Sequence, residues 1–492
     1  MLRTLLKTAG GYGFAECEST SSLSEPQLEG RSGSRLLRRE TSDFGIVEKS
    51  SRRAVTRLRS ILQSDDVGPS MLILLAQIRP RLLYSVTKSS PKHIKLTGNL
   101  YDNCQMVFGT LLDFLTDKTD DQIDQALPSE KLATGNSSKL LIGAIAKFSS
   151  SLPALGDLHE HYGVEPAMAW NLCRPLIRAA MVAKEEANKL AKNDAKNSDE
   201  DSGISEQLAL YLPNSDAMRN AYSTMVPKPA WKRITPSLYE AFFSHSLYDI
   251  NCPEERYATE IARLNKEIER LNKLKKGGAA AAGTMSVLAA AAAAAGGTDR
   301  EIREALVFSK DNQMELERVT RSSEVLSSDH KRQMTHCTAV RESIKSESKA
   351  LFPSLDDNPV ERHAIEVFIT YCVYPRCLLS PEDAVYCAHF ITLLHELDTP
   401  GFSTLTYFDC LISTVAGGIY SVTEDEAGNL SLMLEETWKI LMGWRYTEKN
   451  FEKDVAGKVR YRYLVWKSLV PSILLSIRFS KALIQTSCCL YI

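Results

Sequence analysis

The sequence has little of what marks several common classes of protein. It contains 11 cysteines among 492 residues, which is far below the density of a small secreted disulfide scaffold. The odd number of cysteines also favours reduced thiols over a full set of disulfides. Its 25 glycines and 19 prolines are too few for a collagen-like or linker-dominated chain. A net charge of −2 excludes a uniformly basic nucleic-acid binder.

Long apolar runs are also missing. Residues 284–295 are rich in alanine, and they are too short and too weakly apolar to span a membrane. Residues 464–479 are interrupted by Lys467, Pro471 and Arg478. The first residues are basic and apolar but lack a clear cleavage site, so we favour an ordinary helix start over a targeting peptide. The sequence therefore predicts a soluble intracellular protein with no membrane partner.

Sequence signatures of catalysis are absent too. There is no GxxxxGK[ST] phosphate loop, no GxGxxG after a strand and no GxSxG nucleophile elbow. His159 and His161 are two residues apart, whereas the zincin motif needs histidines at i and i+4. We therefore predict that the chain is not an enzyme and needs no cofactor.

A zinc site is the sharpest chemical alternative. The cysteines and histidines concerned lack paired CxxC knuckles, although their types suit zinc: Cys372, Cys377, Cys387, His389, His395 and Cys410. Two of them, Cys387 and His389, point roughly 200° apart on one helix. We favour core thiols and predict no metal.

Helical patterns fill most of what remains. Apolar residues follow helical spacing through Leu100–Leu115, and an apolar block at Met71–Ile78 is expected to end at Pro80. Two helix starts carry a capping hydroxyl before a proline, at Thr235 and at Ser380. The helix after Ser380 is apolar on a broad surface, which suits a helix between neighbours. The predicted fold class is all-α, an extended helical scaffold of α-solenoid-like helix stacks.

A coiled-coil arm is predicted over residues 254–276. Four apolar residues with 3-4-3 spacing form a seam for a partner helix: Ile261, Leu264, Ile268 and Leu271. An Ala/Gly-rich insert follows, and a long charged helix then occupies residues 299–350. The simplest geometry is a protruding antiparallel helical hairpin with the insert at its tip.

A basic segment covers residues 31–59, where nine basic and three acidic residues give a local net charge of +6. Eight arginines are candidates for contact with nucleic-acid phosphates: Arg31, Arg35, Arg38, Arg39, Arg52, Arg53, Arg57 and Arg59. The alternative, which we favour, is a solvated loop and helix face.

Composition changes divide the chain into six expected regions. The first three are a partly disordered basic segment (1–49), a central helical region (50–183) and a polar linker with connecting helices (184–226). The next is a region with the hairpin and its insert at 277–298 (227–353), followed by a compact helical stack (354–457) and a divergent tail (458–492).

Four blocks resemble one known family. Four segments are similar to THO complex subunit 2 proteins, in the family's order: SSRRAVTRLRSILQSDDVGPSMLILLAQIRP…KHIKLTGNLYDNC, WKRITPSLYEAFFSHSLYDINCPEERYATEI, FITYCVYPRCLLSPEDAVYCAHFITLLHELDTPGFSTLTYFD and TEDEAGNLSLMLEETWKILMGW. The PRC…S..DAVYCA.F run is the most specific of these matches. The family's long all-helical fold agrees with the independent prediction above.

The resemblance implies a nuclear, non-enzymatic scaffold in mRNA processing and export coupled to transcription. Its implied partners are the other THO complex subunits, a DEAD-box RNA ATPase of the export pathway, and mRNA bound directly or indirectly. The alternative from the residues themselves is an RNA-binding helical protein that uses residues 31–59.

The chain departs from the family pattern at both ends. Family members are much longer, and the likeness stops after about Gly457. A truncated or mis-joined gene model and a diverged short paralogue both explain this, and we favour the first.

Overall fold

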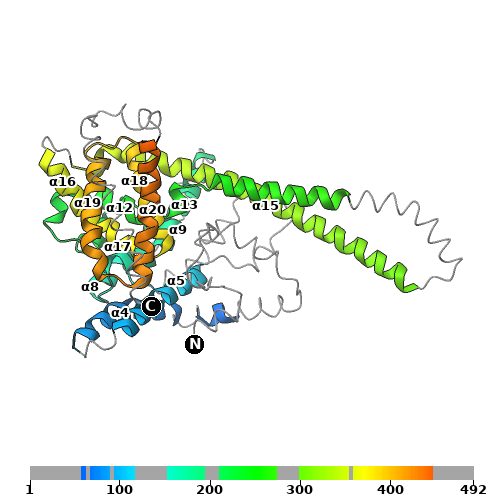
Figure 1. Cartoon of the computed structure of the whole chain (residues 1–492), viewed down its shortest axis with the longest axis horizontal. Coiled ribbons are helices and arrows are strands. Elements are labelled where there is room, and N and C mark those ends of the chain that lie inside the picture. The colour runs from blue at the N-terminus through cyan, green and yellow to red at the C-terminus, as the bar shows by residue number, and fades with distance from the viewer. Residues whose placement is uncertain are drawn as a thin grey trace. The chain divides into compact units, whose positions relative to one another are not determined.

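The computed structural model of the chain describes residues 57–62, 67–88, 94–116, 152–193, 210–273, 299–353 and 358–446. The regular elements within these ranges are helices, which confirms the predicted all-α fold class (Figure 1). None of these described helices is both long enough and apolar enough to cross a membrane. Three predicted regions lie outside the described residues: the N-terminal segment 1–49, the insert 277–298 and the tail 458–492.

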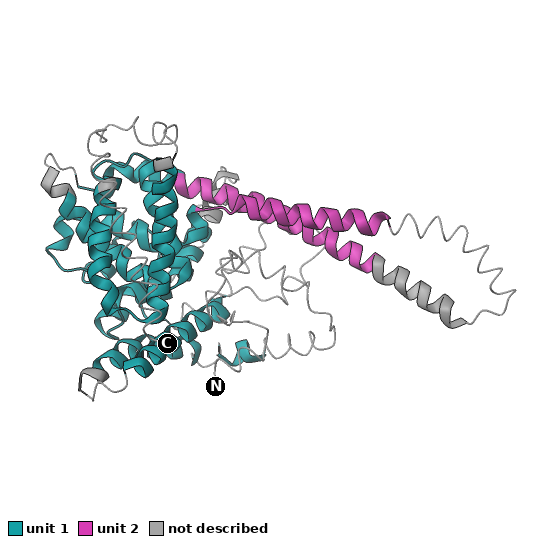
Figure 2. Cartoon of the chain, viewed as in Figure 1, with its two compact units in different colours: residues 1–28, 44–250, 342–492 teal, residues 29–43, 251–341 magenta. Residues whose placement is uncertain are grey.

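The described residues divide into two units (Figure 2). Unit 1 contains residues 57–250 and 342–446, and unit 2 contains residues 251–273 and 299–341. These limits differ from the regions expected from composition, because unit 1 joins segments on both sides of unit 2 in the sequence. The expected linker also begins within a helix, since α9 (Pro166–Asn193) continues past residue 184.

Unit 1 begins with two helices that pack against each other, α4 (Val67–Lys88) and α5 (Ile94–Thr116). Leu111 and Phe114 of α5 are buried as their spacing predicts. The expectation that Pro80 ends the first helix is wrong, because α4 continues for eight residues beyond it. Proline removes one backbone hydrogen bond from a helix interior, and here packing against α5 outweighs that loss.

The middle of unit 1 is made of short helices around α9. They are α8 (Leu155–Glu160), α11 (Asp216–Tyr222), η4 (Ala230–Lys232), α12 (Pro236–Ser244) and α13 (Leu247–Ile250). The predicted start of α12 is confirmed, since the Thr235 hydroxyl accepts a hydrogen bond from the Leu238 N–H at 3.1 Å and Pro236 follows at the first helical position.

The C-terminal part of unit 1 consists of α16 (Asn358–Phe368), η5 (Ile369–Val373), α17 (Tyr374–Cys377), α18 (Pro381–Glu396), α19 (Thr404–Gly418), η6 (Ile419–Ser421) and α20 (Glu424–Tyr446). Ser380 caps α18 as predicted, because its hydroxyl accepts from the Asp383 N–H at 3.1 Å. The π-helical turn η5 ends two residues before Pro375, which has no N–H for an ordinary helical hydrogen bond. Gly401 has φ +81°, and a Cβ there would lie 2.7 Å from Phe352 Cβ.

Helices distant in sequence meet in unit 1. α18 packs against α13 and α20, α16 packs against α19, and α20 returns to α5 (Figure 1). An aromatic core lies between them, where Phe242 makes ring contacts with Phe243, Phe368, Tyr386 and Phe390. Because α20 closes onto α5, the stack does not follow simple sequence order.

Unit 2 is a pair of packed helices, one over residues 254–273 and the other the 299–341 part of α15 (Asp299–Leu351). Their shared core contains Tyr257, Leu264, Leu271, Val319 and Leu326. On the first helix Tyr257, Leu264 and Leu271 are seven residues apart, and Ile261 and Ile268 pack against the core from the second heptad position.

Candidate interaction surfaces and the junctions that position them

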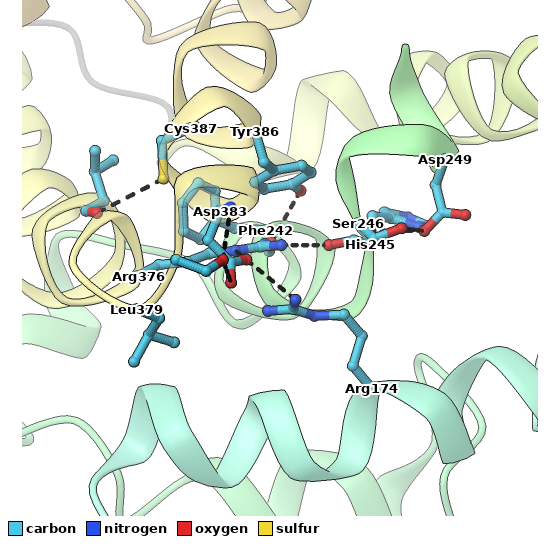
Figure 3. Close-up of polar contacts among 12 residues, drawn as sticks. Arg174, Phe242, His245, Ser246, Asp249, Arg376, Leu379, Asp383, Tyr386 and Cys387 are labelled. Atoms are coloured by element: carbon cyan, nitrogen blue, oxygen red, sulfur yellow. Dashed lines mark hydrogen bonds and ion pairs between the residues drawn. The ribbon is translucent and has the colours of Figure 1, made fainter. Parts of the chain in front are cut away.

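A buried arginine–aspartate junction holds several helices of unit 1 together (Figure 3). Arg376 of α17 is fully buried, and its Nε donates to Asp383 Oδ1 at 2.8 Å. Arg174 of α9 reaches the same oxygen through Nη1 at 3.1 Å. The second oxygen of Asp383 accepts from the Ser380 hydroxyl at 3.0 Å. One carboxylate therefore joins α9, α17 and the start of α18.

The same arginine closes the C-terminal end of α12. Its guanidinium donates to the backbone carbonyls of Phe242 and His245, the second at 2.7 Å. It also lies 3.5 Å from the centre of the Tyr386 ring, whose hydroxyl donates to the Phe242 carbonyl at 2.9 Å. Carbonyls at a helix end lack partners within the helix and favour a cation. Arg376 supplies both the donors and the charge.

The electrostatics of the junction favour the ionised groups despite burial. Burial alone would raise the pKa of Asp383, but Arg174 and Arg376 together hold that pKa below its usual value. Burial, and then repulsion from Arg376, lowers the pKa of Arg174. Removal of one partner from such a group leaves an uncompensated buried charge, so the junction stabilises the packing of these helices.

A second junction joins α4 and α5 to the rest of unit 1. Arg79 lies over the Tyr101 ring, 4.5 Å from its centre, and pairs with Glu165 at 2.5 Å and with Glu426 at 3.4 Å. The Tyr101 hydroxyl donates to Glu426 at 2.9 Å. Nearby, Asp102 accepts from the Asp425 N–H at 3.4 Å, and burial raises the pKa of Asp102 to about 6.

The four residues predicted as a partner-helix seam lie in the core of unit 2. Leu264 and Leu271 are each 2% exposed, and Ile261 and Ile268 pack against the same cluster. The opposing side chains come from α15, so the helix that they contact belongs to this chain. Two polar pairs also join the helices, where the Ser323 hydroxyl donates to Asn265 Oδ1 at 3.1 Å and the Tyr257 hydroxyl donates to Asp329 at 3.0 Å.

The arginines predicted to contact nucleic acid fall mostly outside the described residues; these are Arg31, Arg35, Arg38, Arg39, Arg52 and Arg53. Arg57 is exposed. Arg59 is 5% exposed, and its Nε donates to the Phe114 carbonyl at 3.1 Å while its guanidinium lies over the Phe114 ring. Because it is buried in this contact, Arg59 is not available to a phosphate.

The cysteines considered as zinc ligands lie in the packed core. Cys372, Cys377 and Cys387 are fully buried, and Cys387 Sγ donates to the Val373 carbonyl at 3.7 Å. Burial raises the pKa of Cys387 to about 12. His395 Nδ1 lies 2.9 Å from the Thr404 hydroxyl. Within the described ranges, no three His, Cys, Asp or Glu side chains gather as metal ligands.

Exposed apolar side chains gather on α4 and α5. On α4 they are Val67, Leu74, Ile78, Leu83 and Tyr84, and on α5 they are Ile94, Leu96 and Leu100, with exposed fractions of 39–73%. The burial of Phe114 and the exposure of Leu100 show that the apolar stripe of α5 is only partly covered. Grouped exposed apolar side chains are typical of surfaces that contact other proteins.

Sequence reasoning did not find the two arginine junctions. Their members lie up to 347 residues apart, as Arg79 and Glu426 do. A local sequence pattern does not indicate a contact between residues so far apart. A weak signal existed for Arg376, because a single arginine interrupts the apolar run VYPRCLL seven residues before Asp383. A buried cation needs a partner, and the nearby capped aspartate supplies it.

The fold and these junctions define an all-α protein in which buried charge pairs hold helices together. Comparison with known proteins narrows this class. Residues 231–468 match the family model described as transcription factor/nuclear export subunit protein 2. THO complex subunit 2 of Arabidopsis thaliana is 26% identical over 467 residues, which cover 92% of this chain and 23% of that protein.

Mammalian relatives give the same result. THO complex subunit 2 of Homo sapiens is 24% identical over 442 residues, and that of Dasypus novemcinctus is 24% identical over 450 residues. The chain spans about a quarter of the length of these relatives. The four sequence blocks predicted this similarity to THO complex subunit 2 proteins, which extends over 92% of the chain in the Arabidopsis thaliana comparison.

Proposed function

We propose that this chain acts as a non-enzymatic scaffold subunit of a THO complex, in mRNA processing and export coupled to transcription. The observation that carries the proposal is the alignment of 92% of the chain with a protein named THO complex subunit 2. The proposed location is the nucleus, in accordance with the nuclear export subunit named by the matching family.

The packing of unit 1 supports a scaffold role. Its core is fixed by buried aromatic rings and by charge pairs with little exposure, as at Arg376 and Asp383. Such a core holds surface helices in fixed positions, and a rigid arrangement lowers the entropic cost of binding a partner. The exposed apolar side chains of α4 and α5 supply surface that a partner subunit would cover.

The proposed partners are the other THO complex subunits, a DEAD-box RNA ATPase and mRNA. In this scheme the ATPase carries the nucleotide chemistry, which agrees with the absence of a phosphate-loop motif from this sequence. Contact with RNA through the remaining arginines of residues 31–57 stays a prediction, and Arg59 is removed from that set because it is buried against Phe114.

Affinity purification of the tagged 492-residue chain from nuclear extract tests the proposal. We expect THO subunits in the eluate before and after RNase treatment, and loss of RNA-bridged proteins after it. Phe242→Asp is the matched control, because a carboxylate at this fully buried ring position would unfold unit 1. Proteins recovered with both chains are discounted. Recovery of no THO subunit with the folded chain contradicts the proposal.

A further inference from the structure

A groove of about 680 Å³ lies on unit 1 between α11 and the start of α12. Its lining includes Tyr222, Val226, Trp231 and Pro236, together with Arg219 and Lys228. This volume falls within the range of sites that accommodate small ligands or single side chains. The groove belongs neither to the arginine junctions nor to the hairpin seam.

The aromatic rings present apolar surface to the groove because their polar atoms are hydrogen-bonded to other groups of the protein. The Trp231 indole N–H donates to the Ser223 carbonyl at 3.0 Å, and the Tyr222 hydroxyl donates to Glu240 at 3.0 Å. Each ring also packs on Tyr239, at centroid distances of 5.3 Å and 5.6 Å. The rings are thus held in place, and Val226 and two prolines complete a stiff apolar wall.

The charges at the groove are of one sign. The charged residues that line it are Arg219 and Lys228, both exposed, and no carboxylate is among the lining residues. Lys232 and Arg233 follow Trp231 directly in the sequence. Buried Glu240 accepts from the Tyr222 hydroxyl, and exposed Asp216 pairs with Arg219 at 3.6 Å. Exposed pairs of this kind are weak, so the exposed charges at the groove, Arg219 and Lys228 against Asp216, keep a positive sum.

We propose that this groove binds a short acidic segment of a partner protein, which inserts one apolar side chain against Trp231 and places carboxylates beside Arg219 and Lys228. The apolar floor matches an aliphatic or aromatic anchor side chain, and the cationic rim selects acidic flanks through charge complementarity. Both features are present in the chain as folded, so the site is formed before binding.

Single-stranded nucleic acid is the other anionic polymer, and the geometry favours it less. Nucleic-acid grooves combine a cationic track with aromatic faces on which successive bases stack. Here the groove has two lining cations, and the Trp231 ring is packed on Tyr222 and Tyr239. Asn220, Ser223 and Thr224 also line the groove, but Tyr222, its other aromatic residue, is buried and offers no open face to a second base.

Selection from a phage-displayed library of random 12-residue peptides against the full 492-residue chain tests the proposal. We expect enrichment of peptides that carry one large apolar residue flanked by Asp or Glu. Fluorescence anisotropy with the most enriched peptide then measures its affinity. Lys228→Glu should weaken binding about tenfold or more, and Lys228→Arg should retain it, because the cation and not the lysine is required.

Matched controls separate the groove from general charge effects. Lys184→Glu makes the same charge change at an exposed position on α9, about 21 Å along the helix axis from Trp170, which packs beside Tyr222. It should leave the affinity unchanged. Arg219→Glu is a second reversal at an exposed position, used if the Lys228 variant loses its helical circular dichroism.

Three results would overturn the proposal: no enriched peptide, enriched peptides without acidic residues, or equal affinity for the wild type and Lys228→Glu. A 12-nucleotide oligouridine that binds more tightly than the peptide and depends on Lys228 would also overturn it, since the groove would then be a nucleic-acid site. The assay contains only this chain and the added probe, so its outcome is independent of the THO assembly proposed above.

Discussion

Unit 1 and unit 2 are both helical, yet different interactions stabilise them. In unit 1 the core is broad and aromatic, and buried ion pairs join helices from distant parts of the sequence. In unit 2 the core is a narrow seam between two helices, with polar pairs at Ser323–Asn265 and Tyr257–Asp329. The difference shows that long helices can be fixed by local spacing, whereas a compact helical body depends on long-range contacts.

The largest effect is expected at the junction that is specific to unit 1. Arg376→Ala should lower the free energy of unfolding by about 3–5 kcal/mol, because it leaves Asp383 and two carbonyls buried with fewer partners. Urea denaturation followed by circular dichroism measures the change. The matched control is Arg362→Ala, at an exposed arginine paired with Glu366 and Asp409, which should cost about 1 kcal/mol or less. Equal losses for the two variants would contradict the role of the junction.

A substitution in the seam of unit 2 should lower the free energy of unfolding by less, and its effect should be local. Leu264→Ala removes a side chain that is 2% exposed, and we expect a loss near the lower end of the 2–5 kcal/mol range for buried leucines. The effect should be confined to unit 2, because Leu264 packs on Val319 and Leu326 there. Hydrogen exchange measures this, with faster exchange expected in 254–273 and 313–341. Lys266→Ala, at an exposed position on the same helix, is the control; equally fast exchange in that variant would contradict the seam.

The free energy of unfolding of unit 1 should depend on pH through the buried carboxyl group of Asp102. Burial raises its pKa from 3.8 to about 6, so the folded chain holds this proton more tightly than the unfolded chain. The stabilisation that the proton gives is present below pH 4 and is lost as the pH rises through 6. Asp102→Asn should therefore gain stability relative to the wild type between pH 4.5 and 7, by about 1–2 kcal/mol after solvent screening.

The control for Asp102 is Asp216→Asn, at an exposed aspartate with no such burial. Burial also raises the pKa of Asp425 and of Glu240, so the wild type keeps a slope of the same sign from these groups. The informative quantity is the difference between wild type and variant at each pH, measured by urea denaturation. A difference that stays constant between pH 4.5 and 7 would exclude Asp102 as its source.

The smallest effect is expected on the surface of the hairpin. Arg318→Ala breaks an exposed pair with Glu315, one turn away on α15. Such pairs contribute about 0.2–0.5 kcal/mol and are screened by salt. Thermal denaturation should shift by less than for any variant above, and the shift should shrink further in 1 M salt. A shift as large as that of Leu264→Ala would show that charge pairing, rather than the apolar seam, stabilises unit 2.

The parts that were predictable from the sequence are those set by local chemistry. Thr235 and Ser380 begin helices because a hydroxyl before a proline satisfies the first free N–H groups. The seam from Ile261 to Leu271 followed from its spacing, and the buried cysteines followed from their apolar neighbours. In each case the signal and the structure lie within a few turns of the chain.

The parts that were missed depend on tertiary contacts. Pro80 was expected to end a helix, and packing of α4 on α5 kept the helix intact. Arg59 was grouped with exposed cations, and the Phe114 carbonyl and ring bury it instead. The groove beside Trp231 also needed the fold, because α11 and α12 bring Arg219 and Pro236 to one surface.

The most direct test of the scaffold proposal is reconstitution from purified components. The full chain is mixed with purified THO complex subunits without RNA, and the mass of the product is measured by light scattering after size-exclusion chromatography. We predict a stable complex with one or more of the subunits that survives the column, with Phe242→Asp failing to form it. Separate elution of the folded chain and of every subunit would contradict the proposal.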